Sequence, residues 1–144
     1  MTAEPWGPAP DGVDQPYWDG LTRGDLMLQR CDNCDTWIWG PQWICASCHT
    51  FDPGWQRVEP VGTVYTWSRS WYPFISELPV ERPYVTVLVE LSGAGGRRVL
   101  GILTGDDTDQ VRIGDHVAGH FERDDGATWP MLRWRRVESE GAAA

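Results

Sequence analysis

The clearest pattern of apolar and polar residues lies in the segment PYVTVLVEL, residues 83–91. Every second side chain from Val85 to Leu91 is apolar, and the residues between them include Thr86 and Glu90. Because side chains alternate between the two faces of a strand, this segment predicts a β-strand with one buried face. The glycine-rich sequence SGAGG at 92–96 follows directly and predicts a hairpin loop.

Four other segments show weaker strand patterns between turn residues. They are residues 62–72, 97–104, 116–124 and 130–137. Five strands of this kind predict a small, partly open barrel of the OB type. The sequence does not fix the order of the strands, so a β-sandwich is the alternative fold.

A short helix is predicted over residues 15–22. Asp14 is a suitable N-cap residue, and Gly24 is a suitable residue to end the helix. The apolar side of this helix would consist of Tyr17, Trp18 and Leu21.

All four cysteines of the chain lie in two CxxC pairs that are separated by ten residues: Cys31, Cys34, Cys45 and Cys48. Each pair can present two thiolates from one tight turn, and two facing turns complete the tetrahedral shell that holds structural zinc. A strand at 26–30 leads into the first pair, and a returning strand at 37–44, broken by Gly40 and Pro41, leads into the second. The chain is therefore predicted to be mainly β, with a short N-terminal helix, a rubredoxin-like zinc ribbon and a five-stranded OB-fold barrel.

Other uses of the cysteines are weaker alternatives. Iron fits the same four-sulfur shell, whereas a redox pair uses one CxxC and needs a βαβ context. Disulfides need an oxidising compartment, and the sequence MTAEPWGPAPDG lacks the basic and apolar segments of a signal peptide, so we expect reduced cysteines and a cytoplasmic protein. Asp35 and His49 follow the two pairs where glycine is common. Both residue types tolerate a positive φ, so we interpret His49 as a turn residue and not as a ligand.

The negative charge of the chain argues against nucleic acids as partners. The formal net charge is −9, and it becomes about −11 when four thiolates hold one Zn²⁺. This charge repels nucleic-acid phosphates, although zinc ribbons and small barrels often bind nucleic acids. No apolar run is long enough to span a membrane.

Aromatic side chains mark two candidate partner or ligand surfaces. In the ribbon they are Trp37, Trp39 and Trp43, which either pack the ribbon itself or form an interface. The second surface is the segment 69–84 between the first two barrel strands, with Arg69, Trp71, Tyr72, Phe74 and Arg82. A long apolar loop on a small barrel usually binds something, and the alternative is a loop folded back over the barrel mouth. The two arginines are candidates for pairing with acidic partner residues or coenzyme A phosphates.

The sequence contains no GxSxG, HExxH or phosphate-loop motif. His116 and His120 would share one strand face, but we interpret them as solvated side chains. The acidic run at 106–109 lacks the spacing of a calcium loop, and Arg97 and Arg98 at the hairpin are interpreted as a solvated edge. We therefore expect no catalysis from this chain alone.

The chain resembles a known family, the zinc-ribbon proteins with a C-terminal OB fold that were long catalogued as a domain of unknown function and are associated with acyl-CoA enzymes. The resemblance covers residues 15–137, and no single strand motif in it is specific. The resemblance rests on the order in which these segments occur: YWDGLTRGDLMLQRC, CDNC, CASC, VGTVYTWS, PYVTVLVEL, LGILT and VRIGDHV.

The resemblance implies an accessory subunit that binds and supports a thiolase-fold, lipid-transfer-protein-like thiolase or aldolase acting on acyl-CoA thioesters. Steroid side-chain degradation, with its aldolases and hydratases, is among the pathways it implies. The catalytic residues would lie in the partner, and coenzyme A would contact this chain in some complexes.

We expect four regions along the chain. They are a flexible leader (1–14), the helix and zinc ribbon (15–58), the OB fold (59–137) and a flexible tail (138–144). The alternative function is a single-stranded nucleic-acid-binding module, in which Tyr65 and Trp67 would stack on bases.

Overall fold

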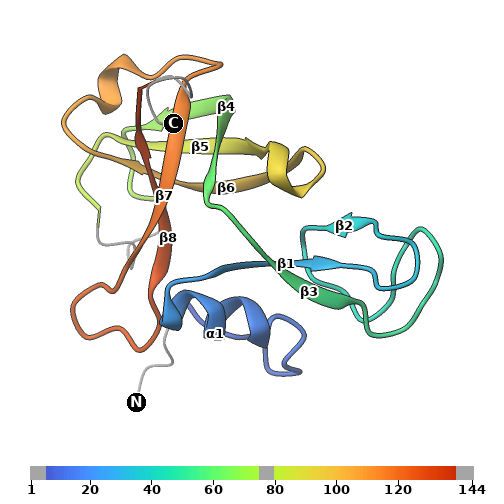
Figure 1. The fold of residues 1–144 in the computed structure, drawn as a ribbon. Helices are drawn as coiled ribbons and strands as arrows, with labels where there is room; N and C mark the ends of the chain where they lie inside the picture. Colours follow the sequence, from blue (N-terminus) through green and yellow to red (C-terminus); the bar gives the residue numbers. More distant parts are fainter. Residues whose placement is uncertain (1–5, 75–79, 139–144) are drawn as a thin grey trace.

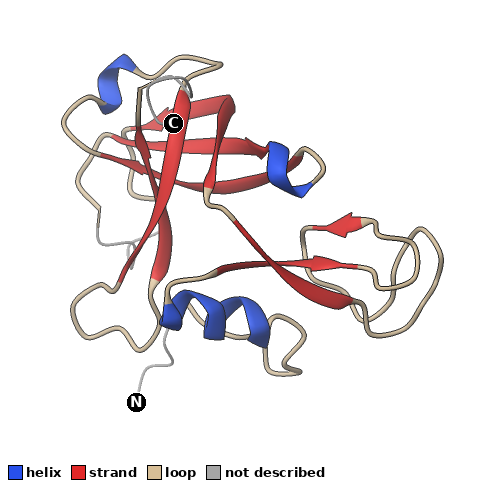
Figure 2. Ribbon diagram, viewed as in Figure 1, coloured by secondary structure: helices blue, strands red, loops and turns tan. Residues whose placement is uncertain are grey.

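The computed structural model describes residues 6–74 and 80–138. The N-terminal part contains the helix α1 (Gln15–Arg23) and the ribbon strands β1 (Leu26–Arg30), β2 (Trp37–Ile38) and β3 (Gly54–Val58). The C-terminal part contains the barrel strands β4 (Val61–Ser70), β5 (Tyr84–Leu91), β6 (Arg97–Thr104), β7 (His116–Glu122) and β8 (Met131–Arg136), with short 3-10 turns η1 (Ser92–Ala94) and η2 (Thr108–Gln110). Figure 1 shows the ribbon beside the barrel, and Figure 2 distinguishes helices from strands in the same view.

The helix α1 occupies the predicted position and ends at Gly24, which adopts a left-handed conformation with φ of 90°. Asp14 stands at the predicted N-cap but makes no side-chain cap. Its carboxylate instead accepts hydrogen bonds from the Ala9 N–H (2.8 Å) and from Trp18 Nε1 (3.1 Å). The Asp14 side chain therefore holds the turn before the helix. The predicted apolar side faces inward, and burial raises the pKa of Tyr17 well above its ordinary value.

The ribbon is a three-stranded antiparallel sheet in the order β2-β1-β3. The predicted returning strand at 37–44 is wrong in length, because β2 ends at Ile38 and Gly40 turns the chain with φ of 83°. The strand β3 is absent from the sequence prediction, although it pairs with all five residues of β1. Its segment GWQRV has too few apolar residues to show an alternation.

The five C-terminal strands form a closed barrel in the order β4-β5-β6-β8-β7. This confirms the predicted strands and the OB-type barrel, and it excludes a β-sandwich. The prediction of a partly open barrel is wrong, because β8 pairs with both neighbours: it runs parallel to β6 and antiparallel to β7. Residues 116–118 of β7 pair with 61–63 of β4 and complete the ring.

One apolar core runs from the ribbon into the barrel. Leu26 and Leu28 of β1 and Val58 of β3 belong to the same buried cluster as Val87 and Trp134 of the barrel. In Figure 1, α1 lies alongside β1 and beside the lower ends of β7 and β8. The ribbon and barrel thus share a core, which fixes their relative position.

Part of the expected leader contacts the rest of the molecule. A Cβ added at Gly7 would lie 2.9 Å from Trp129 Cδ1, and the Asp11 carboxylate accepts a hydrogen bond from Trp43. Within 6–74 and 80–138, no helix is long and apolar enough to cross a membrane.

The packing of Trp134 against β6 gives a first prediction. A Cβ added at Gly101 would lie 2.7 Å from Cδ1 of Trp134, which is completely buried. We expect Gly101→Ala to lower the free energy of unfolding by about 1–3 kcal/mol, because the ring has no space to move.

Gly93→Ala is the matched control, because an added Cβ there meets nothing within 4 Å. Thermal and urea denaturation of both variants would measure the difference. Equal stability of the two variants would contradict the packing described for Trp134.

Candidate functional site

The two CxxC segments fold into the same turn. The Asp35 N–H donates to the Cys31 carbonyl (2.9 Å), and the His49 N–H donates to the Cys45 carbonyl (2.8 Å). Asp35 and His49 have φ of 62° and 65°, as expected for residues at these turn positions. Both turns therefore direct two sulfurs toward the same point between them.

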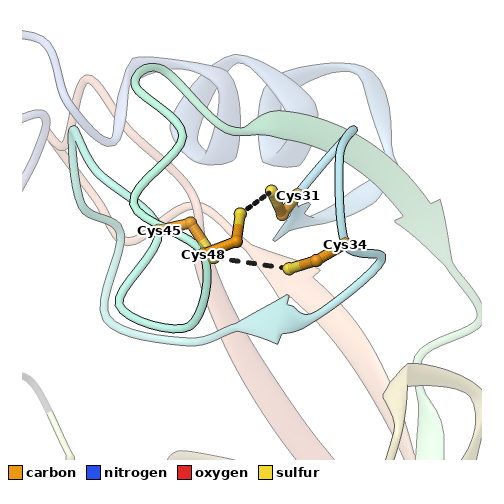
Figure 3. Close-up of side chains that lie close together, drawn as sticks. All are labelled: Cys31, Cys34, Cys45 and Cys48. Atoms are coloured by element: carbon orange, nitrogen blue, oxygen red, sulfur yellow. Dashed lines mark hydrogen bonds between the residues drawn. The ribbon is translucent and has the colours of Figure 1, made fainter.

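The four sulfur atoms form one cluster (Figure 3). Cys31 Sγ lies 3.5 Å from Cys48 Sγ, Cys34 Sγ lies 3.7 Å from Cys45 Sγ, and all four lie within 4.8 Å of one another. Zinc–sulfur bonds of 2.3 Å in a tetrahedron place the sulfurs about 3.8 Å apart. The cluster therefore fits a zinc ion with little movement.

Hydrogen bonds around the cluster favour the thiolate form of Cys48. The Sγ atoms of Cys34 and Cys48 each lie 3.1 Å from a threonine hydroxyl, that of Thr36 and that of Thr50. Hydrogen bonds from the Asn33 side chain and from Thr50 lower the pKa of Cys48 to about 5. The two threonines were not predicted from the sequence, but the repeated spacing CxxCxT in both turns is a signal that identifies them.

A four-cysteine shell has no open position for a substrate or water, so the bound zinc would act as a cross-link between the two turns. Such a cross-link is needed here because the buried cluster around it contains only Cys31, Ile38 and Cys45. His49 is exposed and belongs to no metal-ligand group in the described parts of the chain.

Trp37 and Trp39 of the ribbon face the barrel. The Trp37 ring lies against the β5–β6 hairpin, where a Cβ added at Gly95 would be 2.7 Å from Trp37 Cδ1. Trp39 packs edge-on against Tyr17 with ring centroids 5.4 Å apart, and both tryptophans pack against the core. The sequence left open whether these tryptophans pack within the protein or form an interface. Packing within the protein accounts for most of the contacts of Trp37 and Trp39.

Trp43 lies farther out, with 41% of its surface exposed. Its Nε1 donates to the Asp11 carboxylate (3.0 Å), and this hydrogen bond holds the pKa of Asp11 below its ordinary value. Trp43 thus ties the N-terminal segment to the ribbon and keeps part of its ring in solvent.

The β4–β5 segment presents three exposed aromatic residues, Trp71, Tyr72 and Phe74, which we call the aromatic patch. Their exposed fractions are 71%, 65% and 73%. Tyr72 and Phe74 contact each other edge-on at 5.0 Å. These three side chains are therefore not buried against the barrel. Residues 75–79 of the segment lie outside the described residues.

The two arginines of this segment differ. Arg69 donates to the Thr108 carbonyl (3.4 Å) and lies 5.2 Å from the Trp67 ring, so the barrel holds it. Arg82 lines an open pocket of about 540 Å³ beside Trp71 and Glu81. Of these two arginines, only Arg82 therefore remains available to pair with an acidic partner residue or a phosphate beside the aromatic patch.

Both residues considered for base stacking, and two of those considered for further metal binding, have other partners. Arg98 lies 3.6 Å from the Tyr65 ring, and Arg69 lies over Trp67. His120 Nε2 contacts Glu122 Oε1 at 2.7 Å, and in the acidic run Asp107 pairs with Arg136 at 2.8 Å.

The metal centre gives a second prediction. We expect Cys34→Ser to reduce the zinc content below one ion per chain and to lower the melting temperature by about 10 °C, because losing the cross-link costs about 3 kcal/mol or more. Metal analysis and a thermal melt of the same sample would measure both effects. Ser47→Ala is the control, because Ser47 is exposed and lies between two cysteines without changing the ligand set. Unchanged stability of Cys34→Ser would refute a structural role, and a coloured, iron-containing protein would refute zinc.

Comparisons with known proteins agree with this architecture. Residues 18–54 match the ChsH2 rubredoxin-like zinc ribbon domain, and residues 55–122 match the ChsH2 C-terminal OB-fold domain. A "probable enoyl-CoA hydratase alpha subunit" of Thermomonospora curvata is 34% identical in an alignment of 124 positions that covers 83% of this chain. The chain spans only 37% of the length of that relative.

Two solved structures share the fold. A structure described as an Ltp2-ChsH2(DUF35) aldolase aligns with a TM-score of 0.79 and 27% identity, over 90% of this chain and 98% of that chain. A DUF35 protein of unknown function from Sulfolobus solfataricus aligns with a TM-score of 0.58 over 90% of this chain and 87% of that chain. At 14% identity, the latter shows the common fold alone. Because its zinc ribbon and its OB barrel match the two ChsH2 domains in the same order, the chain belongs to the ChsH2 (DUF35) family.

Proposed function

We propose that this chain is a non-catalytic accessory subunit that binds and supports a thiolase-fold, lipid-transfer-protein-like thiolase or aldolase acting on acyl-CoA thioesters. The observation that carries the proposal is the likeness to the ChsH2(DUF35) chain of an aldolase complex, which this chain matches over nearly its whole length. The name of the enoyl-CoA hydratase relative supports a coenzyme A thioester as the substrate class. Steroid side chains are the acyl groups we would test first.

The aromatic patch is the surface we propose for the partner. Three neighbouring aromatic side chains with 65–73% of their surface exposed are unusual on a small domain. Burying one such side chain contributes about 1.5–3 kcal/mol, and Trp and Tyr are enriched among interface residues that dominate binding energy. The patch alone would therefore supply much of the affinity for a partner.

Arg82 would set the orientation of the partner at the rim of this surface. Its guanidinium makes no ion pair within the described part of the chain, and it lies beside Trp71. A planar guanidinium pairs well with a carboxylate of the partner. Trp43 is a second candidate contact, on the ribbon.

The proposal predicts the result of a co-purification experiment. We expect the tagged chain to capture an acyl-CoA enzyme from extracts of its source organism in near-equal amounts. The double variant Trp71→Ala/Tyr72→Ala should weaken this binding by about 30-fold or more, because two residues of this kind together contribute about 2 kcal/mol or more.

Phe51→Ala is the matched control, because Phe51 has the same exposed fraction of 71% but lies on the ribbon. Mass spectrometry would identify the captured protein, and a titration would measure its affinity. Equal binding by the double variant and the control would contradict the proposed surface. Capture of nucleic acid without an acyl-CoA enzyme would contradict the proposed function.

A further inference from the structure

A groove of about 420 Å³ lies where the ribbon meets the barrel, and we call it the junction groove. Its lining residues are Trp39 of the ribbon and Gly96, Arg97 and Arg98 of the β5–β6 hairpin. Both sides of the groove are fixed by packing. Trp39 is held against Tyr17 and the core, and the hairpin is held by the contact of Trp37 with Gly95. The groove therefore exists before any ligand binds.

The charge in the junction groove is opposite to that of the whole chain. Two of its four lining residues are arginines and none is acidic, in a chain with a net charge of −9. Arg98 is compensated by Glu90 (3.2 Å) and lies over Tyr65. The Arg97 side chain is exposed and makes no ion pair or hydrogen bond within the described residues. One guanidinium in the groove is therefore left without an anion.

Two other pockets differ from the junction groove because acidic residues line them. A pocket of about 330 Å³ at the far end of β6 is lined by Glu81, Glu122 and Asp124. Its buried Arg133 already pairs with Glu122 (3.4 Å) and Asp124 (3.1 Å). The open pocket beside the aromatic patch also contains Glu81. An anionic ligand is therefore favoured in the junction groove and disfavoured in these two pockets.

The chemistry of the groove fits a phosphate next to a flat ring. A guanidinium binds phosphate through two parallel hydrogen bonds, and an indole offers a face or edge to a purine. The volume lies within the range of small-molecule sites and is far too small for an extended nucleic-acid strand, which the acidic surface would also repel.

We propose that the junction groove binds the phosphorylated adenine nucleotide end of a coenzyme A thioester, with Arg97 on a phosphate and Trp39 against the adenine. This inference rests on the proposed function, which supplies the class of ligand. Arg97 and Trp39 are binding residues in this account and take no part in bond making. Arg97 and Arg98, expected from the sequence to be a solvated edge, acquire this role because the ribbon places Trp39 beside them.

Calorimetric titration of the zinc-loaded chain with adenosine 3′,5′-bisphosphate tests the inference. We expect the bisphosphate to bind and adenosine to bind at least about tenfold more weakly, since adenosine lacks the charge-assisted hydrogen bonds. Arg97→Gln should weaken bisphosphate binding by about tenfold, and increasing salt should weaken it further. Trp39→Leu should weaken both ligands.

Arg135→Gln is the matched control. It removes the same charge from an exposed arginine of β8 that pairs with Thr104, at the opposite end of β6 from Arg97. This control should bind the bisphosphate like the unaltered chain. Equal affinities of Arg97→Gln and Arg135→Gln, or no saturable binding by the unaltered chain, would overturn the inference. Zinc content and melting temperature would show that each variant is folded.

Co-purification with the same variants separates this inference from the proposed function. If an acyl-CoA enzyme co-purifies with the chain but nucleotide affinity does not depend on Arg97, the groove inference fails and the proposed function stands. If the nucleotide binds through Arg97 while no acyl-CoA enzyme co-purifies, the groove inference stands and the proposed function fails.

Discussion

The arrangement of the molecule depends on the four cysteine sulfurs that gather between two identical turns. The ribbon around them has almost no apolar core of its own, since its buried cluster contains only Cys31, Ile38 and Cys45. The metal that this cluster fits would supply the missing cross-link. The first turn leads directly into Trp37 and Trp39, which pack on the barrel. The position of the ribbon on the barrel follows from the apolar core that Leu26, Leu28 and Val58 share with the barrel. The metal centre would hold the turn that presents Trp39 to the junction groove.

The features predicted from the sequence are those with strong local signals. The CxxC pairs, the positive φ of Asp35 and His49, and the five barrel strands all have such signals, and the structure contains them. The strand β3 has no apolar alternation and forms because β1 offers it a complete partner. The closure of the barrel depends on the pairing of β8 with β6. Because these strands are distant in sequence, no local pattern predicts that they pair.

In the candidate site, too, the sequence identifies only the residues that have a strong local signal. The cysteines were identified by spacing alone, whereas the roles of the aromatic residues depend on tertiary contacts. Trp37 and Trp39 are turned toward the barrel, while Trp71 and Phe74 are turned outward. Arg69 and Arg82 flank one loop and look equivalent in the sequence, but the Thr108 carbonyl holds only Arg69. Trp39 of the ribbon and Arg97 of the barrel line one groove, and no pattern in the sequence indicates that they lie there together.

The central claim is that this chain lacks a reaction of its own and works on the surface of an acyl-CoA enzyme. A cryo-EM structure of the complex isolated from the source organism tests it most directly. The account predicts an acyl-CoA enzyme of thiolase fold with Trp71, Tyr72 and Phe74 buried in the contact, and with the reacting groups in the partner. A complex with another class of protein, or one in which these three aromatic side chains remain in solvent, would contradict it.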